Sequence, residues 1–502
     1  MAVIDIPLTG FAPDLPPLGS SAFTRIHNAT AGRGATQGTI SLNSMKAASL
    51  YSNTSMDSRP IGSAVGQNRT GDAKVYAGNA TKLYKLAPDT RAWTNISRSG
   101  GYTTSGTEKW KSIEFGSLSI FTNWDNEPQY IDRNVDTQFA NLTTLVKGRH
   151  IATFKGFTLL GWTWDSLDGA VPYRVRWSGI ENPADWTYSA ATQADFQDIQ
   201  GYGGVTGIVT DDSCYVLLQR GIVQMTYIGA PYVFQFTERS SKGCSVPESV
   251  ITVQGVSYFL SDDGWYSLAG GQLQPIGTGI DQWFLDNFDA SQAHLMTVAA
   301  DPRETLIYWQ VCSKDSIGGK PDLMLIYNYA TGAWTTADAT TNHICNAISL
   351  PWTVDQLDQF LSIDKVPSSF DDPIWSGGKS MLWGMSDTGA VYSFGGDTLE
   401  MAIESADYQL SKIVPNETGA DIARVDAVRP LFEGDGQARV QVATRSLPNA
   451  DLNWSEAKDT SSITGFAYHR SQSRYQRFRV TIDGEWRRCS GLQVDARSVG
   501  RR

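Results

Sequence analysis

The sequence predicts an all-β protein with a β-propeller-like body of irregular blades and a small additional C-terminal β-sandwich or platform domain. Glycine (47 residues), tryptophan (16), tyrosine (20) and phenylalanine (19) are plentiful, while charged residues make up only 19% of the chain. This balance suits many short strands and tight turns. Short β-prone runs also recur at intervals of roughly 40 residues, the scale of one four-stranded propeller blade. Because the repeat is loose, a sandwich or a two-domain β protein is the alternative.

Residues 1–71 are expected to form an extended, loop-rich N-terminal segment. The proline-rich run Phe11–Gly19 cannot sustain a helix or a central strand, and the residues that follow it, as far as Asn68, are mostly small and polar. Such a segment buries little apolar surface by itself. We therefore expect it to be flexible in the isolated chain or to wrap along the body or a partner.

Residues 72–420 are expected to form the β-propeller-like domain. Its clearest part is Tyr173–Asp263, where three strand pairs follow one another across turns such as Asp211-Asp212-Ser213. The loosely repeated units are Lys74–Ser97, Lys109–Asp132, His150–Trp186, Val205–Gly229, Gly243–Leu268, Ala299–Trp334 and Lys379–Phe394. Both faces of Leu323–Tyr329 are apolar, which predicts a buried strand followed by a turn and by Trp334 packing on the next blade.

One short helix is predicted over Gly279–Phe288. Its apolar residues Ile280, Trp283, Phe284 and Phe288 fall on a single face at helical spacing.

Residues 421–502 are expected to form an arginine-rich C-terminal β domain. Val428–Ser446 resembles a hairpin with its turn at Gly434-Asp435-Gly436, and Tyr475–Arg502 supplies at least two more strands. The arginines there indicate either a solvated strand face or an electropositive surface for an acidic partner or DNA phosphates. The residues that would face such a partner are Arg487, Arg488, Arg501 and Arg502.

Composition narrows the possible functions. The net charge of −11 argues against tight nonspecific DNA binding, which needs a basic surface. Five scattered cysteines without a C-x-x-C spacing predict free buried thiols, with neither a zinc site nor a disulfide framework. The N-terminus has no basic region typical of a signal peptide, and no apolar run is long enough for a membrane span. A soluble protein made in the cytoplasm is therefore expected.

The sequence contains none of the catalytic motifs that we considered. G-x-S-x-G, H-E-x-x-H and P-loop patterns are absent, and the five histidines are isolated. Ser261, Asp263 and Gly264 partly match the Asp box of sialidase-type propellers, but the glycine comes one residue early, which favours a turn that lets Trp265 pack. Asp211-Asp212 and Asp371-Asp372 lack the array that calcium loops need. We expect no enzymatic activity, no cofactor and no metal.

Three tryptophans are predicted to be structural anchors. Trp177 and Trp186 flank Asn182-Pro183, and Trp265 follows the turn just described. The chain has more aromatic residues than one core needs, so some of them belong either between blades or at subunit interfaces.

From about Lys74 to its end the chain resembles a known family. Lys74–Leu86 (KVYAGNATKLYKL), Ser97–Ser105 (SRSGGYTTS), Arg174–Trp186 (RVRWSGIENPADW), Gly255–Gly277 (GVSYFLSDDGWYSLAGGQLQPIG) and Arg477–Arg502 carry the resemblance in this order. Together they are similar to phrases of the tail nozzle, or tail hub, proteins of short-tailed bacteriophages. These proteins are also called packaged-DNA stabilisation proteins or tail accessory factors. The first seventy residues match least.

The resemblance implies a structural virion protein of the phage tail, assembled in the host cytoplasm. Members form a ring, usually a homohexamer, below the portal and adaptor proteins and beside tail fibres or tailspikes. The ring retains the packaged genome, and double-stranded DNA passes through its lumen without specific binding. The alternative is a propeller-type carbohydrate-binding or receptor-binding tail component, or one that cleaves glycans. An intracellular propeller scaffold is the third hypothesis.

Overall fold

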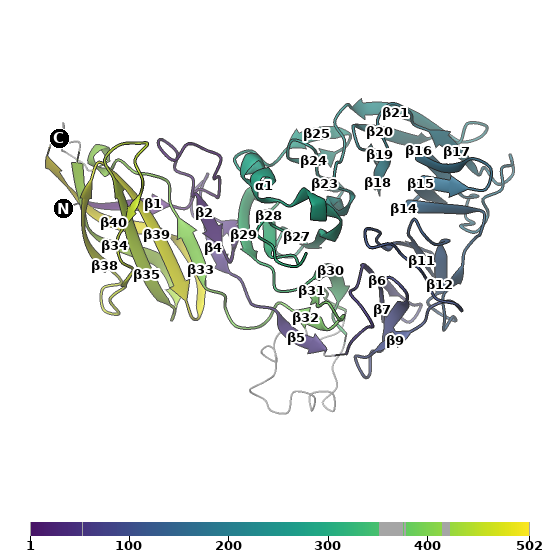
Figure 1. Cartoon of the computed structure of the whole chain (residues 1–502), viewed down its shortest axis with the longest axis horizontal. Coiled ribbons are helices and arrows are strands. Elements are labelled where there is room, and N and C mark those ends of the chain that lie inside the picture. Colours follow the sequence, from purple (N-terminus) through teal and green to yellow (C-terminus); the bar gives the residue numbers. More distant parts are fainter. Residues whose placement is uncertain (1, 53, 351–374, 376–377, 414–421, 501–502) are drawn as a thin grey trace.

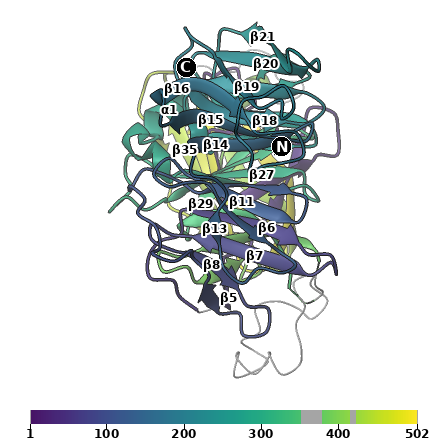
Figure 2. The ribbon, with the colours of Figure 1, turned by 90° about the vertical axis from the view of Figure 1, so that its right-hand side faces the viewer.

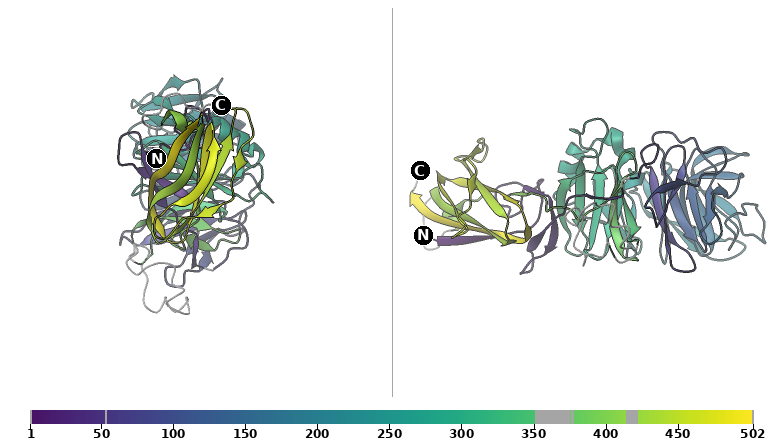
Figure 3. Two further views of the ribbon diagram at one scale, coloured as in Figure 1. Left: turned by 90° about the vertical axis from the view of Figure 1, so that its left-hand side faces the viewer. Right: turned by 90° about the horizontal axis from the view of Figure 1, so that it is seen from below.

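The computed structural model describes residues 2–52, 54–350, 375, 378–413 and 422–500, and it is built almost wholly of strands. Figure 1 shows two bodies side by side, a propeller seen along its axis and a β-sandwich, here called the platform, on its rim. Both chain termini lie at the platform, at the far end of the elongated molecule (Figures 1 and 3). This arrangement confirms the predicted fold class.

The first four blades of the propeller are four-stranded antiparallel sheets formed in chain order. Blade 1 contains β6 (Gly62–Gln67), β7 (Ala73–Gly78), β8 (Leu83–Leu86) and β9 (Trp93–Asn95). Blade 2 contains β10 (Lys111–Phe115), β11 (Leu118–Thr122), β12 (Gln129–Asp132) and β13 (Ala140–Asn141). Blade 3 contains β14 (Val146–Phe154), β15 (Phe157–Asp165), β16 (Gly169–Trp177) and β17 (Asp195–Asp198). Blade 4 contains β18 (Val205–Thr210), β19 (Cys214–Leu218), β20 (Gly221–Tyr227) and β21 (Phe234–Ser240). Figure 2 shows blades 3 and 4 on the side away from the platform.

The remaining blades carry the helical segments. Blade 5 contains the 3-10 helix η1 (Pro247–Ser249) and strands β22 (Ile251–Val253), β23 (Val256–Leu260), β24 (Trp265–Ala269) and β25 (Gln272–Pro275). The helix α1 (Asp281–Asn287) and the 3-10 helix η2 (Ala290–Leu295) lead to blade 6, with β26 (Thr297–Asp301), β27 (Leu306–Val311), β28 (Leu323–Asn328) and β29 (Ala333–Asp338). Blade 7 contains β30 (His343–Ile348), β31 (Ser380–Met385), β32 (Val391–Ser393) and β5 (Ser49–Ser52). The predicted helix is confirmed, with Phe284 fully buried, and the seven predicted units fall on the seven blades.

The ring of blades is closed by a strand from the N-terminal part of the chain. The last blade takes β5 as its fourth strand, with Ser393 opposite Ser49. The inner strand β30 of this blade contacts β6, the inner strand of blade 1. Blades 1 and 7 share an apolar cluster that includes Val75, Trp93 and Trp383, so closing the ring buries blade faces that an open array would leave exposed.

Residues 1–71 are therefore divided differently from the single loop-rich segment that we expected. They form strands β1 to β6, which serve both bodies, and the expected boundary at residue 71 falls inside blade 1. The inner strand β6 reads as weak because it contains Gly62, Ser63, Ala64 and Gly66. Small residues are required there, since a side chain at Gly62 would overlap Trp110 of the next blade.

The platform packs two sheets face to face around one apolar core. The first sheet contains β1 (Ala2–Pro7), β3 (Ala29–Arg33), β4 (Ile40–Ser44), β34 (Ile422–Gly434), β38 (Ala467–Ser473) and β40 (Trp486–Gly500). The second contains β33 (Met401–Glu404), β35 (Gln437–Arg445), β36 (Asn453–Trp454), β37 (Lys458–Asp459) and β39 (Tyr475–Asp483). Buried side chains such as Val425, Phe478 and Val494 fill the space between them. The platform thus begins before residue 421, because β33 belongs to it; the short 3-10 helix η5 (Leu410–Lys412) follows that strand.

The predicted hairpin at Val428–Ser446 is wrong in its pairing. The strands β34 and β35 do meet at the predicted turn, but β34 pairs with β38 and β40, whereas β35 pairs with β39. At the turn the chain passes from one sheet of the sandwich to the other. In both strands alternate residues are buried, so each strand presents one apolar face to the core from its own sheet.

One continuous sheet joins the platform to the propeller. The strand β2 (Arg25–His27) pairs with β29 of blade 6 through His27 and Thr336, and on its other side it pairs with β33 of the platform. Blade 6 and the second platform sheet are therefore parts of a single ten-stranded sheet.

Candidate functional site

Trp177 and Trp186 are buried, with 4% and 1% of their surface exposed. The indole of Trp177 donates to the carbonyl of Gln193 (2.8 Å) and stands edge-on to Phe234 of blade 4 at 5.0 Å. The indole of Trp186 donates to the carbonyl of Pro183 (2.9 Å) and packs into the core between blades 2 and 3. The two rings hold the loop between them against the neighbouring blades on both sides.

Trp265 lies at the centre of an aromatic cluster between blades 5 and 6. Its ring is fully buried and lies 4.5 Å from that of Trp309 and 5.2 Å from that of Phe284 on α1. Trp334 joins this cluster and donates to the carbonyl of Ile276 (2.9 Å). Trp334 of blade 6 thus packs on the preceding blade, which corrects the prediction that it would pack on the next one.

The partial Asp-box sequence forms a turn that positions Trp265. Gly264 has φ +147°, and the backbone N–H of Trp265 donates to the carboxylate of Asp281 (2.9 Å). Asp263 pairs with Lys242 and accepts from the hydroxyl of Tyr266 (3.0 Å). The residues of this motif are thus used in local packing.

The candidate partner-facing arginines are exposed where the structure describes them. Arg487 and Arg488 lie near the start of β40 with exposed side chains, and Arg488 donates to the carbonyl of Arg33 (2.9 Å). Arg501 and Arg502 lie outside the described residues.

Other arginines of the platform are bound internally. Arg477 donates to Asp407 (2.8 Å) and Glu404 (3.0 Å), and Arg479 donates to Glu404 (2.8 Å). Arg445 pairs with the same Asp407, whose side chain is only 1% exposed. These arginines therefore hold the platform together and are not available to a partner.

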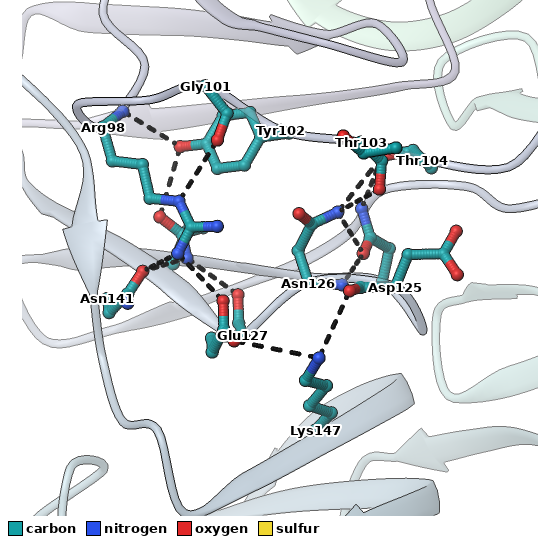
Figure 4. A network of polar contacts seen from close by, with 12 residues as sticks. Arg98, Gly101, Tyr102, Thr103, Thr104, Asp125, Asn126, Glu127, Asn141 and Lys147 are labelled. Carbon is teal, nitrogen blue, oxygen red and sulfur yellow. Dashed lines mark hydrogen bonds and ion pairs between the residues drawn. The ribbon is translucent and has the colours of Figure 1, made fainter.

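The phrase Ser97–Ser105 connects three blades. Figure 4 shows the polar network around this loop. Arg98 donates to Glu127 (2.9 Å), and Lys147 of blade 3 lies 3.8 Å from the same carboxylate. Asn126 donates to a carbonyl of the loop (3.1 Å). The loop thus connects blade 1 to blades 2 and 3.

A cavity of about 440 Å³ lies along the propeller axis, lined by the inner strands β6, β10, β26 and β30. A second cavity of about 210 Å³ adjoins it at the ends where the chain enters the inner strands, and both are lined by Lys109, Lys111 and Glu248. The Nζ atom of Lys111 lies 2.7 Å from Glu248. At the rim, the guanidinium of Arg149 forms a two-pronged pair with Glu108 (2.6 and 3.2 Å). We call Arg59, Glu108, Lys109, Lys111, Arg149 and Glu248 the channel cluster.

Lys109 is the uncompensated member of the channel cluster. Only 7% of its surface is exposed, and its ammonium group has no hydrogen-bond partner among the described residues. Burial is the main cause that lowers its pKa to about 8; Glu248 opposes the shift, while Arg59 and Lys111 add to it. Since burial disfavours the charged form of an amine, a cation held here without a counter-ion destabilises the folded chain.

The buried His343 lines the larger cavity, and the buried His150 lies close enough to Lys111 and Arg149 for their charges to act on its ring. Burial, followed by the charges of Lys109 and Arg59, lowers the pKa of His343 to about 3. Burial likewise lowers the pKa of His150 well below its usual value. Both rings are therefore neutral near pH 7 and add no charge to the channel cluster.

Sequence reasoning missed the channel cluster. Lys109 and Lys111 lie in the predicted second unit, but Glu248 belongs to the fifth and Arg59 to the N-terminal segment. The only local signal was a pair of lysines flanking the buried Trp110, where the inner strand β10 begins.

The described residues contain no group of three or more His, Cys, Asp or Glu side chains arranged to hold a metal ion. They also include no helix of the length and apolarity needed to cross a membrane.

No family model matches the chain, and no curated protein matches it. Several solved structures are similar to the chain at low identity. The extracellular domain of the proposed one component system BT4673 from B. thetaiotaomicron matches 90% of this chain with 11% identity and a TM-score of 0.39, and the chain spans 58% of that domain. The Neurospora crassa Pan2 WD40 domain matches 57% of this chain and 82% of its own length, with 6% identity and a TM-score of 0.35. The AfRom2 CNH domain matches 69% and 97%, with 9% identity and a TM-score of 0.33.

Proposed function

We propose that the chain is a structural subunit of a bacteriophage tail, a nozzle or hub that forms a ring-shaped conduit below the portal and adaptor proteins. In this role it retains packaged DNA and passes it during ejection. The observation that carries the proposal, beside the resemblance of its sequence phrases, is the rigid union of propeller and platform. Such a union suits a wall element better than a flexible binding module.

The union includes a set of partly exposed polar contacts at β2. His27 shares hydrogen bonds with Thr336 and Asp338, both at 3.0 Å, and Asn28 exchanges two bonds with Asp338, also at 3.0 Å. The hydrogen bond from His27 is the main cause that lowers the pKa of Asp338 to about 2. These bonds hold the backbone of the N-terminal segment against blade 6.

Apolar packing strengthens the same junction. A single core cluster runs from platform residues such as Val480 through Phe23 and Ile26 to Trp334 and Phe284 at blades 5 and 6. Domains in one chain move relative to each other unless their interface is large and hydrophobic. A shared core and a shared sheet therefore give the two bodies one fixed orientation, which a ring of identical subunits needs in order to close with constant curvature.

The charge of the chain fits a conduit for DNA. Each subunit contributes a net charge of −11, so a ring multiplies this value by the number of subunits. Phosphates moving past an acidic wall release no counter-ions and are not held. DNA would pass without specific binding.

Electron microscopy of the purified full chain tests the proposal, alone and mixed with portal-bearing heads. We expect rings with a central lumen, six-fold in symmetry, that attach to the portal vertex. A monomer at all concentrations that leaves the heads unaltered and binds in a glycan array would overturn the proposal in favour of a carbohydrate-binding or receptor-binding component.

A further inference from the structure

The propeller contains two adjoining cavities, both bordered by the buried Lys109, that neither the resemblance nor the proposed function explains. In a chain of net charge −11, the channel cluster gathers four cations and two carboxylates: Arg59, Lys109, Lys111 and Arg149 against Glu108 and Glu248. Two of the cations are neutralised within the cluster, Lys111 by Glu248 and Arg149 by Glu108. Lys109 and Arg59 have no carboxylate within ion-pair distance among the described residues.

Elsewhere in the chain, some buried cations are paired with carboxylates. In the platform, the equally buried Arg477 lies against two carboxylates. Arg59 donates one bond, to the carbonyl of Asn342 (2.8 Å), but its Nε atom is buried without a partner. Lys109 has none at all. Buried charges are normally paired or bind an ion, since an isolated one costs several kcal/mol.

The cavities offer the space that such an ion needs. Lys109 and Lys111 line both of them, and the larger has about 440 Å³ beside the lysines. Glu114 and Glu248 also line the larger cavity, but Glu248 pairs with Lys111 and Glu114 pairs with Arg133. Among the described residues, the charge of Lys109 is thus left without a counter-charge there, and a low-dielectric site of this kind attracts an anion. The guanidinium of Arg149 is held at the mouth of the cavity by Glu108 and by the face of Trp162, whose ring centroid lies 4.1 Å away.

We propose that the axial cavity of the propeller binds a small, multiply charged oxyanion of the phosphate class, with Lys109 as its direct ligand. Lys111 would contact both the anion and Glu248, and Arg59 would raise the local potential. A phosphate group suits the site because charge-assisted hydrogen bonds from ammonium and guanidinium groups to its oxygens are among the strongest in proteins. The site is independent of ring formation and of the DNA lumen, because it lies on the axis of one subunit.

The test is a titration of the full chain at pH 7 in phosphate-free buffer, by calorimetry and by thermal unfolding. Inorganic phosphate is compared with sodium chloride at equal ionic strength. We expect saturable binding of phosphate and a rise in Tm, with an affinity at least about tenfold lower in Lys109→Met. The matched control, Lys74→Met on blade 1, should bind as the unmodified chain does. A nucleoside 5′-monophosphate in a parallel titration shows whether a free oxyanion or a phosphate on a larger body is preferred.

If Lys109→Met does not fold, a second variant that is expected to raise the affinity still tests the proposal. Glu248→Gln removes a carboxylate from the cavity and should raise the affinity for phosphate. Equal effects of phosphate and chloride on the unmodified chain would overturn the proposal and leave a cavity that holds only water. An unchanged affinity in Lys109→Met would do the same.

Discussion

The platform and the propeller channel each gather basic side chains, but they compensate them differently. In the platform, Arg445 and Arg477 share the buried carboxylate of Asp407, and Arg477 also binds Glu404. In the channel, Lys109 is as deeply buried and has no partner among the described residues. Basic side chains therefore stabilise the platform but destabilise the propeller. The difference teaches that burial of a charge indicates a structural role only where its counter-charge is also in place.

The largest expected effect comes from breaking the compensation in the platform. Asp407→Asn leaves two buried guanidinium groups without their shared carboxylate, and it should cost about 3–5 kcal/mol in the free energy of unfolding. Denaturant unfolding of the full chain measures this loss. Asp459→Asn, at an exposed position on β37, is the control and should change stability by no more than about 0.5 kcal/mol. A similar small change in Asp407→Asn would show that the platform does not depend on this network.

The next largest effect is the pH dependence of the unfolding free energy that Lys109 causes. The groups that act on it are Glu248, Arg59, Lys111 and Cys312. Its pKa is about 8 in the folded chain against 10.5 for a free lysine, so the folded state binds fewer protons between these values and stability rises with pH there. Below pH 8 the penalty is fully present, about 3 kcal/mol from the shift of pKa.

Comparing Lys109→Met with the unmodified chain isolates this contribution. In phosphate-free buffer the variant should be the more stable at pH 7, and its advantage should shrink as the pH passes 8 and vanish above about 10.5. The measurement is the free energy of unfolding at a series of pH values. A difference between the two chains that stays constant from pH 7 to 10.5 would mean that Lys109 is not a strained cation.

A smaller effect is expected from breaking the ion pair between Lys111 and Glu248. Glu248→Gln leaves Lys111 without its carboxylate, but both groups are partly exposed, so the loss in unfolding free energy should be about 1–2 kcal/mol. The loss should decrease when phosphate is added, because the anion replaces the missing charge. Thermal unfolding with and without phosphate measures both quantities, and a loss indifferent to phosphate would contradict the link between the pair and the cavity.

The smallest effect on folding is expected at the platform surface. Arg487→Ala with Arg488→Ala should change stability by no more than about 0.5 kcal/mol, because both side chains are exposed. If these residues face a partner in the tail, attachment to portal-bearing heads should weaken in a sedimentation assay. Unaltered attachment would remove them from the interface. Deleting the C-terminal residues from Val494 onward is a poorer test. Val494 is buried in β40, which pairs with β1 and β34, so the deletion would also damage the platform.

Much of the fold could be predicted because its signals are local. Strand runs ending at turns located the blades, and the apolar face of Gly279–Phe288 located the helix. Trp177, Trp186 and Trp265 were expected to be anchors, and all three are buried. The strands of the N-terminal segment could not be predicted from such local signals. These strands are short, and they pair with elements hundreds of residues away, as β5 does with β32.

The sequence by itself determined the all-β class, the repeated blades and the places of the aromatic anchors, because periodicity and turn chemistry act between near neighbours. Only the tertiary structure decided how the ring closes, that β34 and β35 part into opposite sheets, and that β2 joins the two bodies. It also decided which charges are compensated. Lys109 and Glu248 border one cavity only because their blades stand in a ring, and electrostatic interaction depends on distance in space and on burial, neither of which is written in the spacing along the chain.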